Sequence, residues 1–502
     1  MKSIYKIKTW AILPAIACTL TLTGCGDDFL DRQPLGRYTE DDLTSGSLES
    51  QVFAAYAGLR NEGVGGLPFI AVHNIRSDDA DKGSSVSDGI DAENIFDNFQ
   101  YNKDFWLINN YWTGHYNLIS LSNNVITAAN ELENPDQATL VNRAEAKFLR
   151  AYAYFNLVRA FGEVPLINFR VTEESQANVP KSTVAEIYAQ IDADLQEASA
   201  VLPASWDARF TGRLTNYAAH ALHAKTYLYR QNWGAALTSA KMVIGGPYSL
   251  NASYEGIFRE TGENSSESIF EIQAIYTQNL TNLGVAYAQV QGVRGAGVWD
   301  LGWGWNTPTE SLAAAFEAGD PRKDATLLYS GRVNQPYGET VPAATATVPR
   351  PYWNKKVYTD PRIRQEVANR FGQWMNVRII RYADVLLMAA EAANELGGAQ
   401  NTADALSYLE MVRARARGNN SNVLPEVTTT DQVELREAIR HERRVELGME
   451  NERFFDLVRW GVDVEVLHAA GKTGYQVRNR YLPIPQPEID RSGGVLVQNP
   501  NY

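Results

Sequence analysis

The chain has 502 residues, a formal net charge of −13 and only two cysteines, Cys18 and Cys25. An apolar content of 44% and a charged content of 21% are ordinary for a folded soluble protein, and they disfavour wholesale disorder, a collagen-like rod and a multi-span membrane protein. The acidic balance argues against nucleic acid as a partner, because binding to the phosphate backbone requires a basic surface.

Residues 1–24 have the pattern of a secretory signal peptide. Three lysines precede an apolar run from Trp10 through Leu22, and this run is too short to span a bilayer. It ends in Leu22-Thr23-Gly24-Cys25, which resembles the bacterial lipoprotein box. We therefore expect cleavage before Cys25, lipid attachment (diacylglycerol and palmitate) at that cysteine, and a lipidated tether over residues 25–44. A simple secretory signal or a buried N-terminal helix is the alternative interpretation.

The body, residues 45–502, shows mainly helical periodicity. A shift of 169 residues aligns Ala221, Ala224 and Leu237 with Ala390, Ala393 and Leu406, together with the Gln-Asn turn between the helices of each pair. Such spacing is typical of tetratricopeptide-like helix pairs. The clearest predicted helices are Arg143–Phe161, Thr183–Leu202, Thr215–Arg230, Trp233–Ile244, Ile379–Leu396, Thr402–Arg417, Asp431–Leu447 and Phe454–Ala470.

The pattern predicts a mainly α fold in two parts. A helical scaffold occupies mainly residues 111–246 and 378–470. Two irregular insertions, at about 63–110 and 247–376, are rich in glycine, proline and aromatic residues. Because long irregular segments within a compact domain usually serve a function, we expect the ligand site in these insertions.

The usual sequence motifs of catalytic and metal-binding sites are incomplete in this chain. His441-Glu442 begins like a zinc-protease helix, but Val445 stands where the second histidine is required. The Asp78, Asp79 and Asp81 cluster lacks the spacing of a calcium loop. We predict no catalytic residues, no metal and no cofactor. The charged stretch from Glu442 to Arg459 is interpreted as helix-stabilising ion pairs.

Several motifs in order resemble the SusD/RagB family of outer-membrane nutrient-binding lipoproteins, and the resemblance covers nearly the whole chain. They include the Glu145–Phe155 stretch followed by Phe161-Gly-Glu-Val-Pro165, then Asp320-Pro-Arg322, then Arg381–Glu391 and the Leu482-Pro-Ile-Pro485 ending. The resemblance implies a tetratricopeptide-like scaffold with a loop-rich ligand-binding part. It also implies an oligosaccharide or polysaccharide ligand, a location on the outer membrane, and a SusC-like TonB-dependent transporter as the partner.

The resemblance also suggests ligand contacts near the first insertion. Trp106 and Asn109 lie three residues apart, as ligand-contacting positions do in the starch-binding prototype of the family. Arg76, Asp78 and Asp79 lie where the family often places polar ligand contacts. The alternative interpretation for Trp106 is a core tryptophan, and for Arg76, Asp78 and Asp79 it is a solvated loop or a structural salt bridge.

The second insertion holds the densest aromatic cluster, Trp299, Trp303 and Trp305, with glycines on either side that could leave the indoles exposed. Sugars offer apolar faces that stack on such rings. Because Trp303 lies in a framework-like Gly-Trp-Gly segment, it fits the core as well as the site. Tyr276 and Arg294 bracket the same insertion and are further candidates.

Four functions compete at this point. We expect a non-enzymatic surface protein that binds glycan for uptake. The alternatives are the same fold binding peptide or another nutrient, as in the RagB branch, a surface glycoside hydrolase, and a purely structural helical scaffold. The acidic charge of the body fits a neutral ligand better than a polyanion.

Overall fold

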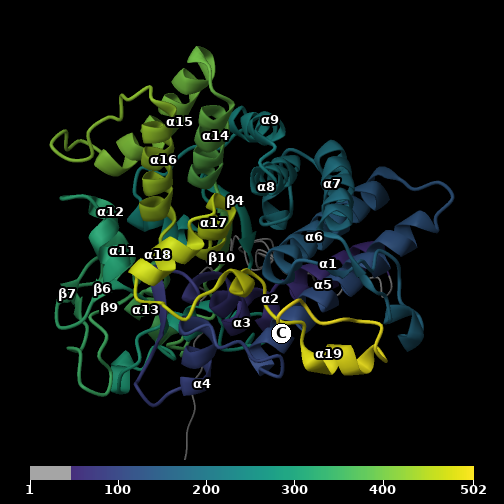
Figure 1. The fold of residues 1–502 in the computed structure, drawn as a ribbon, viewed down its shortest axis with the longest axis horizontal. Coiled ribbons are helices and arrows are strands. Elements are labelled where there is room, and N and C mark those ends of the chain that lie inside the picture. Colours follow the sequence, from purple (N-terminus) through teal and green to yellow (C-terminus); the bar gives the residue numbers. More distant parts are fainter. Residues whose placement is uncertain (1–46) are drawn as a thin grey trace, which may run out of the picture.

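The computed structural model describes residues 47–502, and helices make up most of the described chain (Figure 1). The predicted signal peptide, the predicted lipid attachment at Cys25 and the predicted tether lie outside these residues. Within residues 47–502, none of the helices combines the length and the apolar character needed to cross a membrane.

The long helices form an array in which chain neighbours pack on one another. α5 packs on α6, α6 on α7, α7 on α8, α8 on α9, and α9 on α14, which in turn contacts α15 and α16. Their bounds are α1 Leu48–Gly58, α5 Trp106–Asn130, α6 Gln137–Phe161, α7 Val184–Val201, α8 Asn216–Tyr229, α9 Trp233–Ile244, α14 Tyr382–Leu396, α15 Ala399–Arg417 and α16 Gln432–Leu447. The predicted tetratricopeptide-like scaffold is therefore present.

The two aligned sequence segments form two helix hairpins, α8–α9 and α14–α15. Ala221 and Ala224 of the first hairpin are fully buried, and so are Ala390 and Ala393 of the second. Small side chains at these positions allow the helices to approach closely, which explains why the same residue type recurs in both hairpins.

Side-chain caps fix the starts of several helices. Thr183 accepts a hydrogen bond from the Glu186 backbone N–H, and the Glu186 carboxylate accepts one from Thr183, so α7 begins with a capping box. The Asp431 carboxylate accepts from the second and third backbone N–H groups of α16. These caps satisfy N–H groups that have no partner within the helix.

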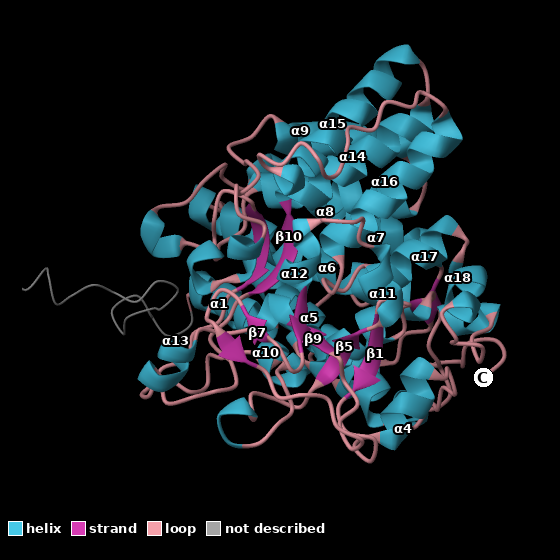
Figure 2. Ribbon diagram, turned by 90° about the vertical axis from the view of Figure 1, so that its left-hand side faces the viewer, coloured by secondary structure: helices cyan, strands magenta, loops and turns pink. Residues whose placement is uncertain are grey.

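Short antiparallel strand pairs build the less regular part, which lies below the long helices in Figure 2. The pairs are β1 Ala80–Gly83 with β5 Trp305–Pro308, β2 Val164–Pro165 with β3 Lys181–Ser182, β4 Ser268–Ile272 with β10 Val377–Arg381, β6 Leu327–Tyr329 with β9 Tyr352–Asn354, and β7 Val333–Asn334 with β8 Glu339–Thr340. The β1–β5 pair joins the two insertions that the sequence predicted to carry the site.

Short helices lie between these elements in the described chain. The α-helical segments are α2 Glu62–Gly65, α3 Leu67–Ile70, α4 Ile90–Ala92, α10 Tyr287–Gln291, α11 Glu310–Ala315, α12 Pro321–Thr326, α13 Pro361–Glu366, α17 Arg453–Trp460, α18 Asp463–Ala469 and α19 Gln486–Arg491. The π-helical and 3₁₀ segments are η3 Ala71–Ile75, η4 Glu93–Asp97, η5 Glu174–Ala177, η6 Ala208–Phe210, η7 Glu255–Phe258, η8 Glu260–Gly262, η9 Gly297–Trp299, η10 Lys355–Val357 and η11 Val477–Arg480.

Two expectations about elements are corrected. The predicted helix over Phe454–Ala470 is two helices, α17 and α18, because Gly461 adopts a left-handed conformation that ends α17. The first insertion is not irregular throughout, since α2, α3 and η3 occupy its first part and are buried. Gly63 there serves packing, because a Cβ atom at this position would lie 2.1 Å from the backbone oxygen of Asn110 in α5.

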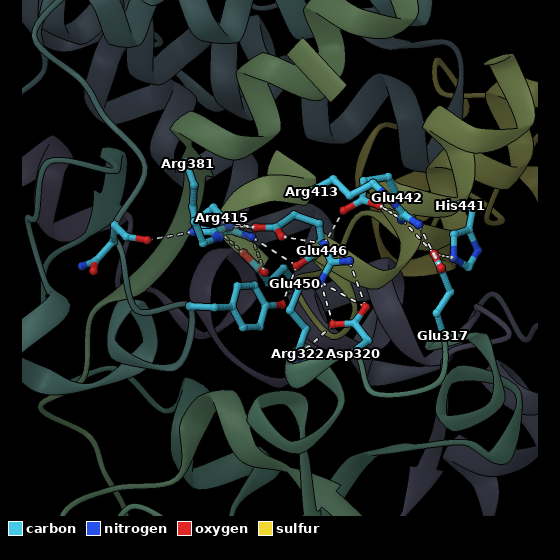
Figure 3. Close-up of polar contacts among 12 residues, drawn as sticks. Glu317, Asp320, Arg322, Arg381, Arg413, Arg415, His441, Glu442, Glu446 and Glu450 are labelled. Atoms are coloured by element: carbon cyan, nitrogen blue, oxygen red, sulfur yellow. Dashed lines mark hydrogen bonds and ion pairs between the residues drawn. The ribbon is translucent and has the colours of Figure 1, made fainter. Parts of the chain in front are cut away.

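The charged stretch on α16 forms a buried ion network, as predicted (Figure 3). Arg381 donates to Glu446 at 3.0 Å and to Glu450 at 2.6 Å, and Arg322 donates to Glu442 at 2.5 Å and to Glu446 at 3.2 Å. Burial alone would raise the pKa of Glu446, but the charges of Arg415, Arg381 and Arg322 hold it well below its usual value. The network ties α16 to β10 and α12.

Candidate functional site

The segment 293–305, here called the tryptophan loop, folds back on α10. The backbone N–H of Trp303 donates to the Gln289 backbone oxygen at 2.9 Å, and the backbone N–H of Leu301 donates to the Val293 backbone oxygen at 3.0 Å. This close approach requires Gly302, because a Cβ atom there would lie 2.1 Å from the Gln289 oxygen. Glycine thus allows the loop to turn tightly while the neighbouring indole points away from the core.

The three indoles of the loop differ in exposure. Trp303 is 36% exposed, so the structure favours the site over the core for this residue. Trp299 is half-buried and packs against the cluster that contains Val293 and Leu301. Trp305 is only 7% exposed, so its burial favours a core role over a ligand contact. It lies in β5, in which all four residues are buried.

Trp305 instead helps to hold Asp88, which lies in the other insertion. Asp88 Oδ2 accepts hydrogen bonds from Trp305 Nε1 at 3.1 Å, from Arg294 Nη1 at 2.9 Å and from Ser84 Oγ at 2.6 Å. Partial burial alone would raise the pKa of Asp88, but these hydrogen bonds, with the charges of Arg294 and Lys82, hold it below its usual value. Asp88 is therefore an anion that fixes the position of Arg294, which is partly exposed.

Polar side chains from two other segments extend this surface. Asp300 pairs with Arg370 at 2.5 Å, and both side chains are partly exposed. Beside them the Gln373 amide donates to Gln289 at 2.7 Å and accepts from Asn369 at 2.9 Å. The Gln289 backbone oxygen also accepts from the Trp303 backbone N–H, which links this amide pair to the tryptophan loop.

We call this set, Gln289, Arg294, Trp299, Asp300, Trp303, Arg370 and Gln373, the tryptophan-loop surface. Tyr276 adjoins it, because a Cβ atom on Gly284 would contact both the Tyr276 ring and Gln373. The surface combines an exposed indole with donors and acceptors of both charge signs. An aromatic face binds apolar C–H surface, and the amides and charged groups can bind hydroxyls.

Trp106 and Asn109 form a second candidate patch at the start of α5. Trp106 is 50% exposed, so its indole is open to solvent. Three residues later, on the same face of the helix, Asn109 Oδ1 is buried and has no hydrogen-bond partner within residues 47–502. A buried acceptor without a partner is costly, which makes this atom a candidate for a ligand or water contact. No contact in the described chain joins Trp106 to the tryptophan loop.

Arg76, Asp78 and Asp79 are buried, which favours structural salt bridges over the expected ligand contacts. Arg76 is fully buried, with its guanidinium 3.8 Å from the ring centre of Phe454. Asp78 pairs with Arg453 at 2.8 Å and Asp79 with Arg444 at 2.8 Å. These groups bind α16 and α17 to the first insertion, and ion pairing explains their burial better than a ligand does.

Sequence patterns carried no clear signal for three members of this surface, Gln289, Arg370 and Gln373, or for Asp88, which supports it. These four residues were not predicted, because they come from three segments that only the fold brings together. The acidic, serine-rich centre of the first insertion was the sole hint of Asp88. Within the described chain, no group of three or more His, Cys, Asp or Glu side chains is arranged to hold a metal ion.

Comparisons with known proteins agree with the resemblance seen in the sequence. The model of the SusD family matches residues 266–480, and a second model, described as starch-binding associating with outer membrane, matches residues 28–228. The chain is 30% identical to SusD-like protein P2 of Formosa agariphila over 97% of this chain and 98% of the relative.

Solved structures show the same fold. A laminarin-binding SusD-like protein is 30% identical, with a TM-score of 0.75 over 91% of this chain and 99% of that chain. Surface glycan-binding protein A from Bacteroides thetaiotaomicron is 25% identical, with a TM-score of 0.75 over 91% and 98% of the two chains. The predicted fold class, a helical scaffold with a loop-rich part, is confirmed.

Proposed function

Because the chain belongs to the SusD family, we propose that it binds an oligosaccharide or polysaccharide at the cell surface and delivers it to a SusC-like TonB-dependent transporter in the outer membrane. In this proposal Cys25 carries the lipid that anchors the protein to the outer membrane. The protein binds its ligand without cleaving it.

The observation that carries the proposal is the exposed indole of Trp303, in a loop that also carries Arg294 and that is hydrogen-bonded to Gln289 of the Gln289–Gln373 amide pair. A sugar ring has an apolar C–H face that can lie on the indole, and hydroxyl groups at its rim that can both donate and accept. Trp303 supplies the first kind of contact, and the charged and amide groups around it supply the second.

Two comparisons support a glycan as the ligand class. One matching family model is described as starch-binding, and a solved relative with 30% identity is named as laminarin-binding. Both ligands are neutral glucose polymers. A neutral polymer also fits a chain with a net charge of −13, which would repel a polyanion.

The proposed division of labour follows the two parts of the fold. The tryptophan-loop surface would hold the glycan, with Trp106 and Asn109 as a second contact patch, and the helical hairpins would face the transporter. An array of stacked helix pairs offers an extended surface suited to a large protein partner.

Calorimetry of the purified protein against laminarin, starch and an equimolar peptide mixture tests the ligand class. We expect one of the glycans to bind and to be recovered intact after overnight incubation, as measured by chromatography. Binding of the peptides alone would favour the RagB-like alternative, and shortened glycan products would favour a glycoside hydrolase. Either result would contradict the proposal.

A further inference from the structure

A cavity of about 380 Å³ lies on the helical scaffold, between α16, α17 and α18. It is remote from the tryptophan loop in the chain, and Figure 1 shows α17 and α18 beneath the lower end of α16. Three arginines line it, Arg440, Arg444 and Arg453, and Leu457 and Val466 give it an apolar portion. The function proposed above does not use these groups.

Arg444 and Arg453 are fixed by hydrogen bonds, but each has a donor group without a partner. Arg453 donates to Asp78 through Nε at 2.8 Å and through Nη2 at 3.0 Å. Arg444 donates to Asp79 through Nε at 2.8 Å and to Ser311 through Nη2 at 2.8 Å. In the part of the chain that the structure describes, Nη1 of neither arginine has a hydrogen-bond partner. The Asp78 and Asp79 pairs thus fix both guanidinium groups and leave one donor group of each available.

Arg440 has fewer hydrogen-bond partners than Arg444 or Arg453. Its Nε is buried and has no partner among residues 47–502, and its Nη1 donates to Glu437 at a long 3.2 Å. Burial lowers the pKa of Arg440, and the charges of Glu437 and Glu391 offset this only in part. A guanidinium with a buried, unpaired N–H group is a ready partner for an anion.

The acidic groups around the cavity balance the arginine charges, because Asp79 and Asp78 pair with Arg444 and Arg453 and because Glu437 and Glu465 also line the cavity. An anion would therefore be held by the unpaired donor groups and not by net positive charge. His441 faces Glu317 at 3.4 Å, on the side of the ion network. Glu437 and Glu465 lie at the exposed rim, where water screens their charges. Glu465 forms no ion pair or hydrogen bond through its carboxylate within the described chain, so it is free to accept a hydrogen bond from a hydroxyl group.

We propose that this cavity binds a carboxylate carried by a small hydroxylated molecule, such as a uronic acid residue or a hydroxy acid. The guanidinium groups of Arg440, Arg444 and Arg453 would hold the carboxylate, for which the planar arginine fork is well matched. Glu465 would accept from a hydroxyl, and Leu457 and Val466 would contact the carbon skeleton. This site is additional to the glycan surface and does not depend on the proposed function.

Titration of the full-length protein with D-glucuronate at pH 7 and low ionic strength tests the proposal, with D-glucose and inorganic sulfate as comparison probes. Arg440→Gln is the diagnostic variant, because Arg440 takes no part in the pairs that hold Asp78 and Asp79. Arg436→Gln is the matched control, since Arg436 lies one turn away on α16, pairs with Glu395 and does not line the cavity.

We expect glucuronate to bind at least tenfold more tightly than glucose or sulfate. Arg440→Gln should weaken glucuronate binding about tenfold, and Arg436→Gln should not change it. Glu437→Gln should strengthen it, because it removes a competing carboxylate. Binding of glycans at the tryptophan loop should be the same in all three variants.

Three results would overturn the proposal. Glucuronate that binds no better than glucose would show that the cavity does not select a carboxylate. Equal binding of sulfate and glucuronate would exclude recognition of the hydroxylated carbon skeleton. Equal losses in Arg440→Gln and Arg436→Gln would indicate general attraction to the arginines of α16 rather than a defined site.

Discussion

At the scale of single residues, Asp88 holds the partly exposed side chain of Arg294 in place. Its carboxylate binds Arg294, Trp305 and Ser84 together, so the position of the Arg294 side chain depends on it. We expect Asp88→Asn to weaken glycan binding about tenfold, roughly 1.4 kcal/mol, because Arg294 loses its charged partner. Calorimetry gives the affinity, and the melting temperature should change little.

The matched control for Asp88 is Asp91→Asn, an exposed change in α4 only three residues further along the chain. It should leave glycan affinity unchanged. If Asp88→Asn also binds normally, then Arg294 needs no anchor or does not contact the ligand.

Glu263 offers a test of stability against pH. Burial raises the pKa of Glu263 to about 7, and the charges of Arg378 and Glu271 modify this in opposite directions. In the unfolded chain a glutamate has a pKa of about 4.3. Between these values the folded protein keeps a proton that the unfolded chain has lost, so stability falls as the pH rises through this window.

Glu263→Gln should remove this fall in stability with rising pH. We expect the free energy of unfolding to exceed that of the unchanged protein by about 1–3 kcal/mol at pH 8, with little difference at pH 4.5. Urea denaturation at the two pH values measures it, and Glu133→Gln in the exposed loop after α5 is the control. A gain of equal size at both pH values would contradict the assignment to this proton.

The sequence could identify the tryptophan cluster but not the orientation of each ring. Trp303 and Trp305 are two residues apart, yet one is open to solvent and the other is buried against Asp88. The difference comes from the pairing of β5 with β1, more than 200 residues earlier in the chain. Local periodicity contains no information about such a distant partner.

At the scale of elements, α16 is tied to the less regular part by buried charges. Glu446 accepts from Arg381 at 3.0 Å and from Arg322 at 3.2 Å, and it also pairs with Arg415. We expect Glu446→Gln to lower the free energy of unfolding by about 3 kcal/mol at pH 7, because it leaves buried guanidinium groups without a counter-charge. Urea denaturation is the measurement.

Glu437→Gln on the same helix is the control for Glu446, because Glu437 is exposed and should change stability by only about 0.5 kcal/mol or less. The pKa of Glu446 is depressed in the folded protein, so its contribution is present above a pH of about 4.3 and is lost as the pH falls below it. Equal effects of the two substitutions at pH 7 would contradict a stabilising role for the network.

Helices with clear caps and periodicity could be predicted well. The predicted Trp233–Ile244 agrees with α9, and Thr215–Arg230 brackets α8. The break at Gly461 was missed, because a single glycine within a periodic pattern is also compatible with a continuous helix. The buried helices of the first insertion were missed because their glycines, which serve close packing, look like loop residues in the sequence.

At the scale of the whole molecule, the helical scaffold is local in sequence and the tryptophan-loop surface is not. Each hairpin of the scaffold is made of consecutive residues, so its repeat was visible before the structure. The tryptophan-loop surface combines side chains from α10, the tryptophan loop and the segment near 370, and it depends on Asp88 of the first insertion. The sequence could point to the tryptophan loop, but not to the residues from other segments that join it in this surface.

The most direct test of the account is the affinity of Trp303→Ala for the glycan that the unchanged protein binds. We predict a loss of at least tenfold with an unchanged melting temperature, because the indole is exposed and its removal leaves no core cavity. Trp305→Ala should instead lower the melting temperature, since that ring is buried. Unchanged affinity in Trp303→Ala would contradict the claim that the tryptophan-loop surface holds the glycan.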